Sequence, residues 1–381
     1  MNLTWPQVCA RRLLRQGLLD PLPAGPADVA AALAAVHAQV LSAAELSVGL
    51  RLAGGTAAGV RDALWTARSL VKTRGPRGTV HLMAATDLPM WTGALSALPV
   101  GRSPFPEGVR LDAGQTDEIV AAIADAVADA ELTVDELTAA IVARTGPWAG
   151  DLVMEAFQGR WPRWRQIEHL AAQRGALCYG PNRGRLVTYT SPRRWLPGFA
   201  PEAAGPALAG VVRRYLHGYG PATAAQFAQW LGAPKPWGAE LFASLGDALE
   251  AVTVDGAPAW VNAGDTTAPE TPPHGVRLLP YFDAYSVGCH PRDKVYPGRA
   301  AERALSNSQG GTFPVLLVDG VVAGVWHLRR SGRRSAVTVE PLGRLAAARR
   351  RELAAQVDRI GEVLGGPATL EIGTVAVGGH A

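Results

Sequence analysis

The sequence predicts a mixed α+β protein with three tandem winged-helix units and a C-terminal β-barrel. Helical segments followed by a two-stranded hairpin occur three times in the first 265 residues, at unequal spacing. A Pro- and Thr-rich stretch, GDTTAPETPPHG, then separates these repeats from a region of strand-like segments. With 381 residues, 48% of them hydrophobic and 18% charged, the chain can form several cores and is not disordered.

Each repeat has the element order of a winged helix, which sets the expected domain boundaries. We expect winged helix 1 in residues 1–105, winged helix 2 in 106–200 and winged helix 3 in 201–265. The barrel domain is expected in 275–381 and includes a C-terminal helix.

Capping and turn signals define the first repeat. Four helices are expected, over about 4–19, 28–36, 42–54 and 57–68. Thr4 with Gln7, and Ser42 with Glu45, fit capping boxes that would open the first and third of these helices. The segment SLVKTRGPRGTVHLM has two β-like runs around Gly75 and predicts the hairpin.

The later repeats follow the same order of elements. Two helices are expected within 113–145, the second opened by Thr133 and Glu136, and a longer helix across 150–173. The segment ALCYGPNRGRLVTYT then predicts a hairpin with GPNRG as its turn. The third repeat has three helical segments, GPALAGVVRRYLHGYG, PATAAQFAQWLG and KPWGAELFASLG, before the hairpin ALEAVTVDGAPAWVNA.

The last part is dominated by strand-like segments. VRLLPYF, TFPVLLVDGVVAGVWHLRR and SAVTVEPL are expected to be strands, with the turn dipeptide Asp319-Gly320 inside the second. The helix RLAAARRRELAAQVDRIGEVL and a last strand, ATLEIGTVAV, complete the predicted barrel.

Positive charge is concentrated in two zones. The formal net charge is +4, and all but three of the 37 basic residues are arginines, which either a GC-rich genome or phosphate recognition would favour. Residues 107–136 hold nine acidic residues and one Arg, whereas 144–195 hold nine Arg and three acidic residues. Residues 321–351 hold eight Arg and one acidic residue. Such zones are either ordinary solvated surface or the footprint of a polyanion, and their place on predicted hairpins favours nucleic acid.

Cysteine usage and hydropathy bound the compartment and the chemistry. Cys9, Cys178 and Cys289 are far apart and form no CxxC pair, which argues against a disulfide framework or a zinc site. The sequence has no apolar run long enough to span a bilayer, and MNLTWPQVCARRLL lacks a signal-peptide core. We expect a soluble, cytoplasmic protein without metal or organic cofactor.

The stretch VHAQV places His37 and Gln39 two residues apart among small apolar side chains. In a helix, two such side chains point about 200° apart, whereas in an extended segment they share a face. Because Ser42 is expected to open the next helix, we expect this stretch to be an extended linker. A converging His and Gln can hold and orient one water molecule, the His accepting its proton. The alternative is a polar linker without a role.

Several stretches together resemble one family, the AlkZ/YcaQ-type DNA glycosylases. HAQ stands where that family has a catalytic Gln-x-Gln or Gln-x-Asp motif. Four longer stretches are similar to family segments in order and spacing: RGTVHLM (77–83), YLHGYGPATAAQFAQWLG (215–232), LLPYFDAYSVGCHPRDKV (278–295) and FPVLLVDGVVAGVW (313–326). The resemblance covers almost the whole chain.

The resemblance implies a C-shaped array of winged helices braced by a β-barrel, with double-stranded DNA in a basic concave channel. It implies hydrolysis of the N-glycosidic bond of bulky N7- or N3-alkylated guanine or adenine, with crosslinks as substrates of some members. Such an enzyme is monofunctional, uses water and needs no Schiff-base lysine. His37 departs from the best-known motif, and His-x-Gln variants resemble members linked to self-resistance in actinomycetes. We expect a monomer associated with the nucleoid.

Other residues are candidates for the same interface. Asp283 is a possible stabiliser of an oxocarbenium-like sugar, or a structural carboxylate. Arg74 and Arg77 flank the turn of the first hairpin and are candidate DNA contacts. The segment HLRRSGRRSAV predicts a hairpin tip with four more candidates, Arg329, Arg330, Arg333 and Arg334.

Two questions remain open from the sequence. In GRWPRWRQ, both Trp161 and Trp164 are expected in the core, although the interleaved arginines also suit contact with a DNA backbone. The rival function for the chain is a non-catalytic DNA-binding protein, either a regulator or a lesion sensor. Such a protein would keep the arginines and have no use for His37 and Gln39.

Overall fold

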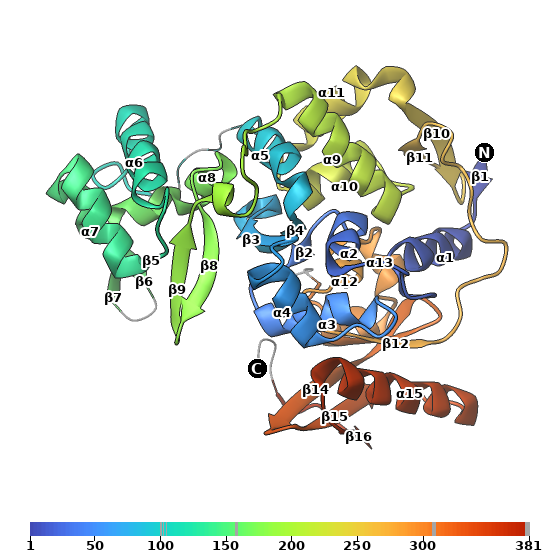
Figure 1. The fold of residues 1–381 in the computed structure, drawn as a ribbon. Coiled ribbons are helices and arrows are strands. Elements are labelled where there is room, and N and C mark those ends of the chain that lie inside the picture. The colour runs from blue at the N-terminus through green and yellow to red at the C-terminus, as the bar shows by residue number, and fades with distance from the viewer. Residues whose placement is uncertain (100, 102, 104, 157–158, 307–309, 378–381) are drawn as a thin grey trace. The chain divides into compact units, whose positions relative to one another are not determined.

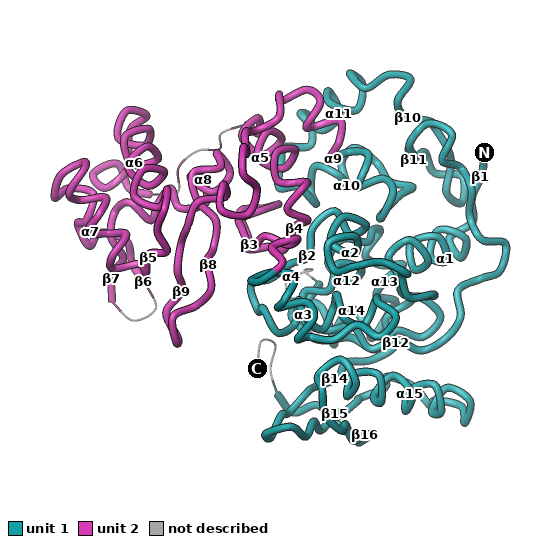
Figure 2. The backbone as a smooth tube through the Cα atoms, viewed as in Figure 1, with its two compact units in different colours: residues 1–66, 212–381 teal, residues 67–211 magenta. Residues whose placement is uncertain are grey.

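The computed structural model describes residues 1–381 except 100, 102, 104, 157–158, 307–309 and 378–381. The chain combines helices and sheets (Figure 1) and divides into two compact units (Figure 2). Unit 1 contains residues 1–66 and 212–381, and unit 2 contains residues 67–211. The expected division into three winged helices and a fourth domain, and the C-shape, stay predictions.

Unit 1 is built from both ends of the chain. Its N-terminal elements are β1 (Asn2–Leu3), α1 (Trp5–Arg15), α2 (Pro26–Ala32), β2 (Val36–His37), α3 (Leu41–Leu50) and α4 (Ala57–Trp65). After α9 (Ala204–Tyr219), in which the boundary falls, come α10 (Ala224–Leu231), α11 (Lys235–Ser244), β10 (Leu249–Val254) and β11 (Ala257–Asn262). The last elements are β12 (Val276–Leu279), α12 (Ala284–Gly288), α13 (Arg292–Val295), α14 (Arg299–Ala304), β13 (Val315–Val318), β14 (Val321–Ser331), β15 (Arg334–Pro341), α15 (Ala347–Leu364) and β16 (Ala368–Ile372).

The first helix confirms its predicted cap and ends earlier than expected. The backbone N–H of Thr4 donates to Gln7 Oε1 at 2.9 Å, as in a capping box. The helix ends at Arg15 because the N–H groups of both Leu18 and Leu19 donate to the carbonyl of Leu13. β1, which the sequence analysis did not identify, pairs in parallel with β10 and joins the chain start to the third predicted repeat.

The predicted capping box at Ser42 is wrong. Helix α3 begins at Leu41, with Val40 in extended conformation as its N-cap. Glu45 is buried in this helix and lies 3.5 Å from the guanidinium of Arg61, so its carboxylate is engaged there. The linker before α3 is therefore shorter than predicted, although it still contains the whole VHAQV stretch.

The C-terminal sheet is open, so the expected β-barrel is wrong. Its five strands follow the order β12-β13-β14-β15-β16, and among the described strands the two edges do not pair with each other. β15 and β16 run parallel, which requires a crossover, and α15 makes it. Side chains of α15 such as Leu353, Val357 and Ile360 fill the core against Trp326 of the sheet. A helix thus occupies the face that a closed barrel would keep inside.

Unit 2 contains two hairpins that the sequence predicted and one that it did not. Its elements are β3 (Leu70–Arg74), β4 (Val80–Ala84), α5 (Leu88–Ser96), α6 (Ala113–Ala126), β5 (Leu132–Thr133), α7 (Val134–Thr145), β6 (Leu152–Ala156), β7 (Gly159–Pro162), α8 (Glu168–Gln173), β8 (Cys178–Arg183) and β9 (Leu186–Thr190). The hairpins β3–β4 and β8–β9 are present as predicted. The predicted GPNRG turn of the second hairpin is wrong, because Gly180 to Arg183 belong to β8 and the turn lies at Gly184 and Arg185. Thr133 caps α7 through its side chain, as expected.

The predicted helix across 150–173 is wrong. Strands β6 and β7 lie in its first half, and the second half consists of a 3-10 turn, Arg163–Ile167, and the short helix α8. Gly159 has a φ of 117°, which no helix accepts, and the ring of Pro162 removes a backbone donor. These two residues interrupt the apolar pattern that suggested a helix. Among the described helices, none has the length and apolar character required to cross a bilayer.

Candidate active site

The VHAQV stretch is extended, as the spacing of its polar residues predicts. Val36 and His37 form β2, and the backbone then bends through Gln39 and Val40 before α3 begins. Val36 and Ala38 are buried, whereas His37 is half-buried and Gln39 is exposed. The alternation places the two polar side chains on the less buried side of the segment.

The preceding turn is anchored to α9. Ala34 adopts a φ of 61°, and the chain reverses between α2 and β2 at this residue. The hydroxyl of Tyr219 donates to the carbonyl of Leu33 at 2.9 Å. Burial raises the pKa of Tyr219, so its hydroxyl stays a donor at any physiological pH. A buried hydrogen bond therefore fixes the turn that precedes His37.

The imidazole of His37 stacks on the ring of Phe282. The two ring centroids are 4.4 Å apart and the planes are inclined by 27°. Phe282 has a φ of 54°, a left-handed conformation that is a rare and strained state for a bulky side chain. The backbone N–H of Phe282 donates to the carbonyl of Gly311 at 3.0 Å, which helps to maintain this conformation. Backbone strain at Phe282 thus orients a ring against the candidate catalytic histidine.

A buried ion pair holds the segment on the other side of Phe282. The carboxylate of Asp283 accepts both Nη groups of Arg51 at 2.8 Å, and both side chains are fully buried. Ser47 donates its hydroxyl to Asp283 at 2.7 Å. The backbone N–H of Tyr285 also donates to Asp283, which thereby caps α12. With four donors, the acceptor positions of Asp283 are already occupied.

Helix α3 therefore connects the two sides of the site. His37 and Gln39 directly precede this helix, while Ser47 and Arg51 lie at its other end and bind Asp283. Almost every side of α3 is buried, as expected for a helix inside a core. A displacement of α3 would move the polar pair and the Phe282 ring together.

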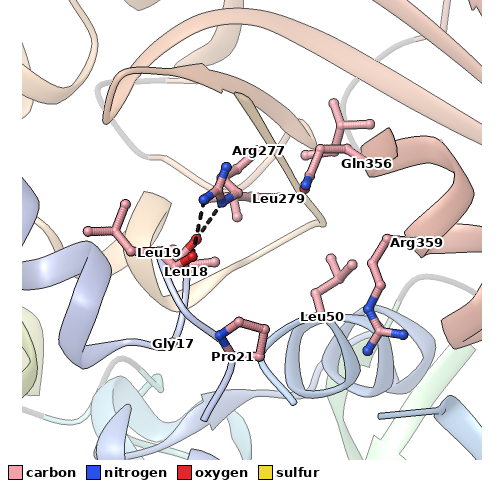
Figure 3. A pocket seen from close by; sticks show the side chains of 10 residues that line it. Gly17, Leu18, Leu19, Pro21, Leu50, Arg277, Leu279, Gln356 and Arg359 are labelled. Atoms are coloured by element: carbon pink, nitrogen blue, oxygen red, sulfur yellow. Dashed lines mark hydrogen bonds between the residues drawn. The ribbon is translucent and has the colours of Figure 1, made fainter. Parts of the chain in front are cut away.

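The cavity in Figure 3 lies beside the far end of α3. It has a volume of about 300 Å³, and its lining does not include His37, Gln39, Phe282 or Asp283. The guanidinium of Arg277 donates to the carbonyls of Leu18 and Leu19 (Figure 3).

The second guanidinium of this cavity is also bound to backbone carbonyls. Arg359 donates to the carbonyls of Gly49 and Leu52 at 2.9 and 2.7 Å. Because cations stabilise the carbonyl end of a helix, Arg359 fixes α3 to α15. The arginines of this cavity thus serve the architecture of the site.

The candidate DNA-binding arginines divide into bound and exposed side chains. Arg329, Arg330, Arg333 and Arg334 are all exposed at the tip of the β14–β15 hairpin, which confirms the predicted turn. In unit 2, Arg77 is exposed at the turn between β3 and β4. The guanidinium of Arg74 instead lies 2.5 Å from the buried carboxylate of Glu168. Their roles in DNA binding stay predictions.

No group of three or more His, Cys, Asp or Glu side chains in the described ranges is arranged to hold a metal ion. A polar pair beside a strained aromatic clamp, on a chain with exposed arginine hairpins, suits an enzyme acting on a polyanion.

Comparison with known proteins identifies the class of enzyme. Residues 30–363 match the model of a family described as DNA glycosylase AlkZ-like. The chain belongs to the AlkZ-like DNA glycosylase family. It is therefore a glycosylase, a hydrolase of N-glycosyl bonds, and the non-catalytic alternative is set aside.

Two relatives from Streptomyces sahachiroi are similar over most of the chain. An interstrand DNA cross-link repair glycosylase is 33% identical over 354 residues, which cover 86% of this chain and 89% of that protein. The solved structure of the DNA glycosylase AlkZ has a TM-score of 0.83 and 28% identity. It covers 98% of this chain and 100% of the other. The mixed helix and sheet fold is thus shared along the full length.

Sequence reasoning missed Phe282 and Arg51. The segment around Phe282 is similar to the family, but its sequence indicates only Asp283 as a candidate site residue. A left-handed phenylalanine leaves no sequence signal, because its strain is visible only in backbone angles. Arg51 follows a helix of apolar residues and reads as an ordinary C-terminal cation. Its buried partner lies far along the chain.

Proposed function

We propose that this enzyme hydrolyses the N-glycosidic bond of bulky N7- or N3-alkylated purines in double-stranded DNA, and that its substrates include interstrand crosslinks. The arrangement that carries the proposal is the polar pair of His37 and Gln39 on an extended segment, with the His37 ring stacked on Phe282. The name of the relative from Streptomyces sahachiroi, an interstrand DNA cross-link repair glycosylase, supports the same substrate class.

The chemistry of the substrate explains why so few groups suffice. An N7-alkylated guanine is cationic, so it leaves C1′ without prior protonation. The enzyme must then supply a positioned water and tolerate an oxocarbenium-like sugar, as in glycoside hydrolysis. His37 accepts the proton of the attacking water, and the amide of Gln39 orients that water through its donor and acceptor atoms.

Phe282 and Asp283 have positioning roles in this proposal. Stacking on Phe282 restricts the imidazole of His37 to one plane, which holds its nitrogen toward the water. Asp283 fixes Phe282 from the neighbouring position through its bonds to Arg51 and Ser47. We assign no charge stabilisation of the sugar to Asp283, because its oxygens are already bonded to protein donors.

Release of free modified base tests the proposal. Duplex DNA with an N7-alkylguanine is incubated with the wild type, His37→Ala, Gln39→Ala and a control, His274→Ala, which changes an exposed histidine in the linker before β12. We expect release by the wild type and the control, and strongly reduced release by the other two. No release by the wild type from any of several adducts would reject the substrate class. Equal release by all four would place the site elsewhere.

The biological role follows from the adduct. The His-x-Gln departure from the usual motif supports a function in self-resistance of an actinomycete that makes a DNA-alkylating compound. Neighbouring genes for the synthesis of such a compound would support this role, and their absence would favour general repair.

A further inference from the structure

A tryptophan on the β6–β7 hairpin of unit 2 is exposed, contrary to the expectation from the sequence. Trp161 has 43% of its surface exposed, whereas Trp164, three residues later, is fully buried and donates its Nε1 to Thr138. A single exposed apolar side chain needs no explanation. The charges around Trp161 make it informative.

Arginines surround the exposed indole. The guanidinium of Arg165 lies 4.1 Å from the ring centroid of Trp161, in a cation–π contact. Arg160, which precedes Trp161 on β7, is exposed and, within the described residues, makes no ion pair or side-chain hydrogen bond. One face of the indole is therefore covered by a cation, and the exposed area belongs to the rest of the ring.

Direct contacts connect this indole to the predicted DNA contacts of the first hairpin. Arg165 also binds the buried carboxylate of Glu168 at 3.1 Å, and Arg74 binds the same carboxylate at 2.5 Å. Arg74 in turn donates to the carbonyl of Gly78, in the turn that exposes Arg77. Arg74 and Arg165 share this one carboxylate, while Arg160 lies opposite Glu155 in the β6–β7 ladder. The indole thus belongs to a connected group of arginine contacts within unit 2.

We propose that Trp161 stacks on an unpaired nucleobase of bound DNA, while Arg160 and Arg165 bind the adjacent phosphates. Arginines that follow a backbone and aromatic rings that stack on bases are the general means of binding single strands. A base inside an intact duplex is already stacked on its neighbours, so the indole can only take a base that has left the stack. The proposal rests on the proposed function only in that DNA is the ligand. It predicts that the enzyme prefers lesions whose flanking nucleotides are unpaired.

The test measures binding without any lesion, so that it does not depend on base release. Three fluorescently labelled probes are used with the full chain: a short duplex, the same duplex with a central run of unpaired thymines, and the single strand. The variants are Trp161→Ala and Trp161→Phe, and the control is Trp260→Ala, which changes a tryptophan on β11 that is 37% exposed. Thermal unfolding followed by circular dichroism verifies that each variant is folded.

Stacking predicts a selective loss of affinity. Trp161→Ala should weaken binding to the bubble and the single strand about tenfold, and to the paired duplex by less than about twofold. Trp161→Phe should restore most of the loss, because it keeps an aromatic face, and Trp260→Ala should bind all probes as the wild type does.

Three results would overturn the proposal. The first is an unchanged affinity of Trp161→Ala for the bubble. The second is a loss of affinity by Trp161→Ala for the paired duplex that equals its loss for the bubble, which would indicate packing against the backbone. The third is the same loss of affinity in Trp260→Ala. A chain that releases no alkylated base can still pass this test, and a chain that releases base can fail it. The outcome is therefore separate from that of the proposed function.

Discussion

The ion pair between Arg51 and Asp283 provides the sharpest prediction about what stabilises the site. Asp283→Ala removes the carboxylate that accepts both Nη groups of Arg51 at 2.8 Å, in a place where both side chains are fully buried. The guanidinium is then left charged, without a carboxylate, in the interior. Removing one partner of such a pair lowers the free energy of unfolding by about 3–5 kcal/mol, which reduces the ratio of folded to unfolded molecules by a factor of about a hundred or more.

The double variant Arg51→Met/Asp283→Leu separates charge from packing. Because apolar residues of similar volume can replace a buried ion pair at little cost, this variant should recover most of the stability that Asp283→Ala loses. Urea unfolding followed by circular dichroism measures the stability of Asp283→Ala and of the double variant. Unit 2 does not contain the pair, so a loss confined to one of two transitions would be consistent with the prediction.

Two results would refute this reasoning. A loss below about 1 kcal/mol in Asp283→Ala would mean that Arg51 finds other partners or water, as surface pairs do. A stable variant with a greatly reduced rate of base release would instead return Asp283 to the role of stabilising the sugar cation.

Three further predictions concern titratable groups. Cys9, Cys178 and Cys289 are buried, and burial raises the pKa of each thiol, that of Cys9 to about 11. None of the three should therefore react with a thiol reagent at neutral pH until urea unfolds the chain. Labelling of the native protein would contradict this prediction. Burial also raises the pKa of Glu45 above its ordinary 4.5, against the charges of Arg61 and Arg330, so the ionised form is less favourable in the folded state. Glu45→Gln should then gain stability relative to the wild type as the pH rises above about 4.5, and show no gain below it. If the difference in urea midpoint between Glu45→Gln and the wild type is the same at pH 4 and pH 8, the shift is contradicted. If His37 accepts the proton of the attacking water, protonation of its ring should slow base release by the wild type in acid, whereas any base release by His37→Gln should lack this pH dependence; parallel pH profiles would argue against proton transfer to His37.

Local signals predicted the elements of this fold well where one residue pattern controls the backbone. The capping boxes of α1 and α7 follow from side chains that satisfy nearby backbone groups, and the turns of the β3–β4 and β14–β15 hairpins follow from their glycines. The failures are cases where tertiary contacts decide. The strand β1 exists only because Asn2 and Leu3 pair with β10, and α15 packs on the sheet that was expected to close into a barrel.

The candidate site was predictable in part for a related reason. The alternation of buried and polar residues in VHAQV, with the resemblance to the family, identified His37 and Gln39 and their extended backbone. The ring that stacks on His37 and the ion pair behind it come from segments that are distant in the chain. No spacing rule connects such segments, since their proximity is a property of the packed core.

The single-turnover rate of base release tests the central claim most directly. Excess enzyme is mixed with a duplex that carries one N7-alkylguanine, and the wild type is compared with His37→Ala, Gln39→Ala and His274→Ala. If His37 and Gln39 activate the water, each of the first two variants should be slower by about 100-fold, while His274→Ala keeps the rate of the wild type. Rates that agree within about twofold in all four proteins would contradict the assignment of the active site.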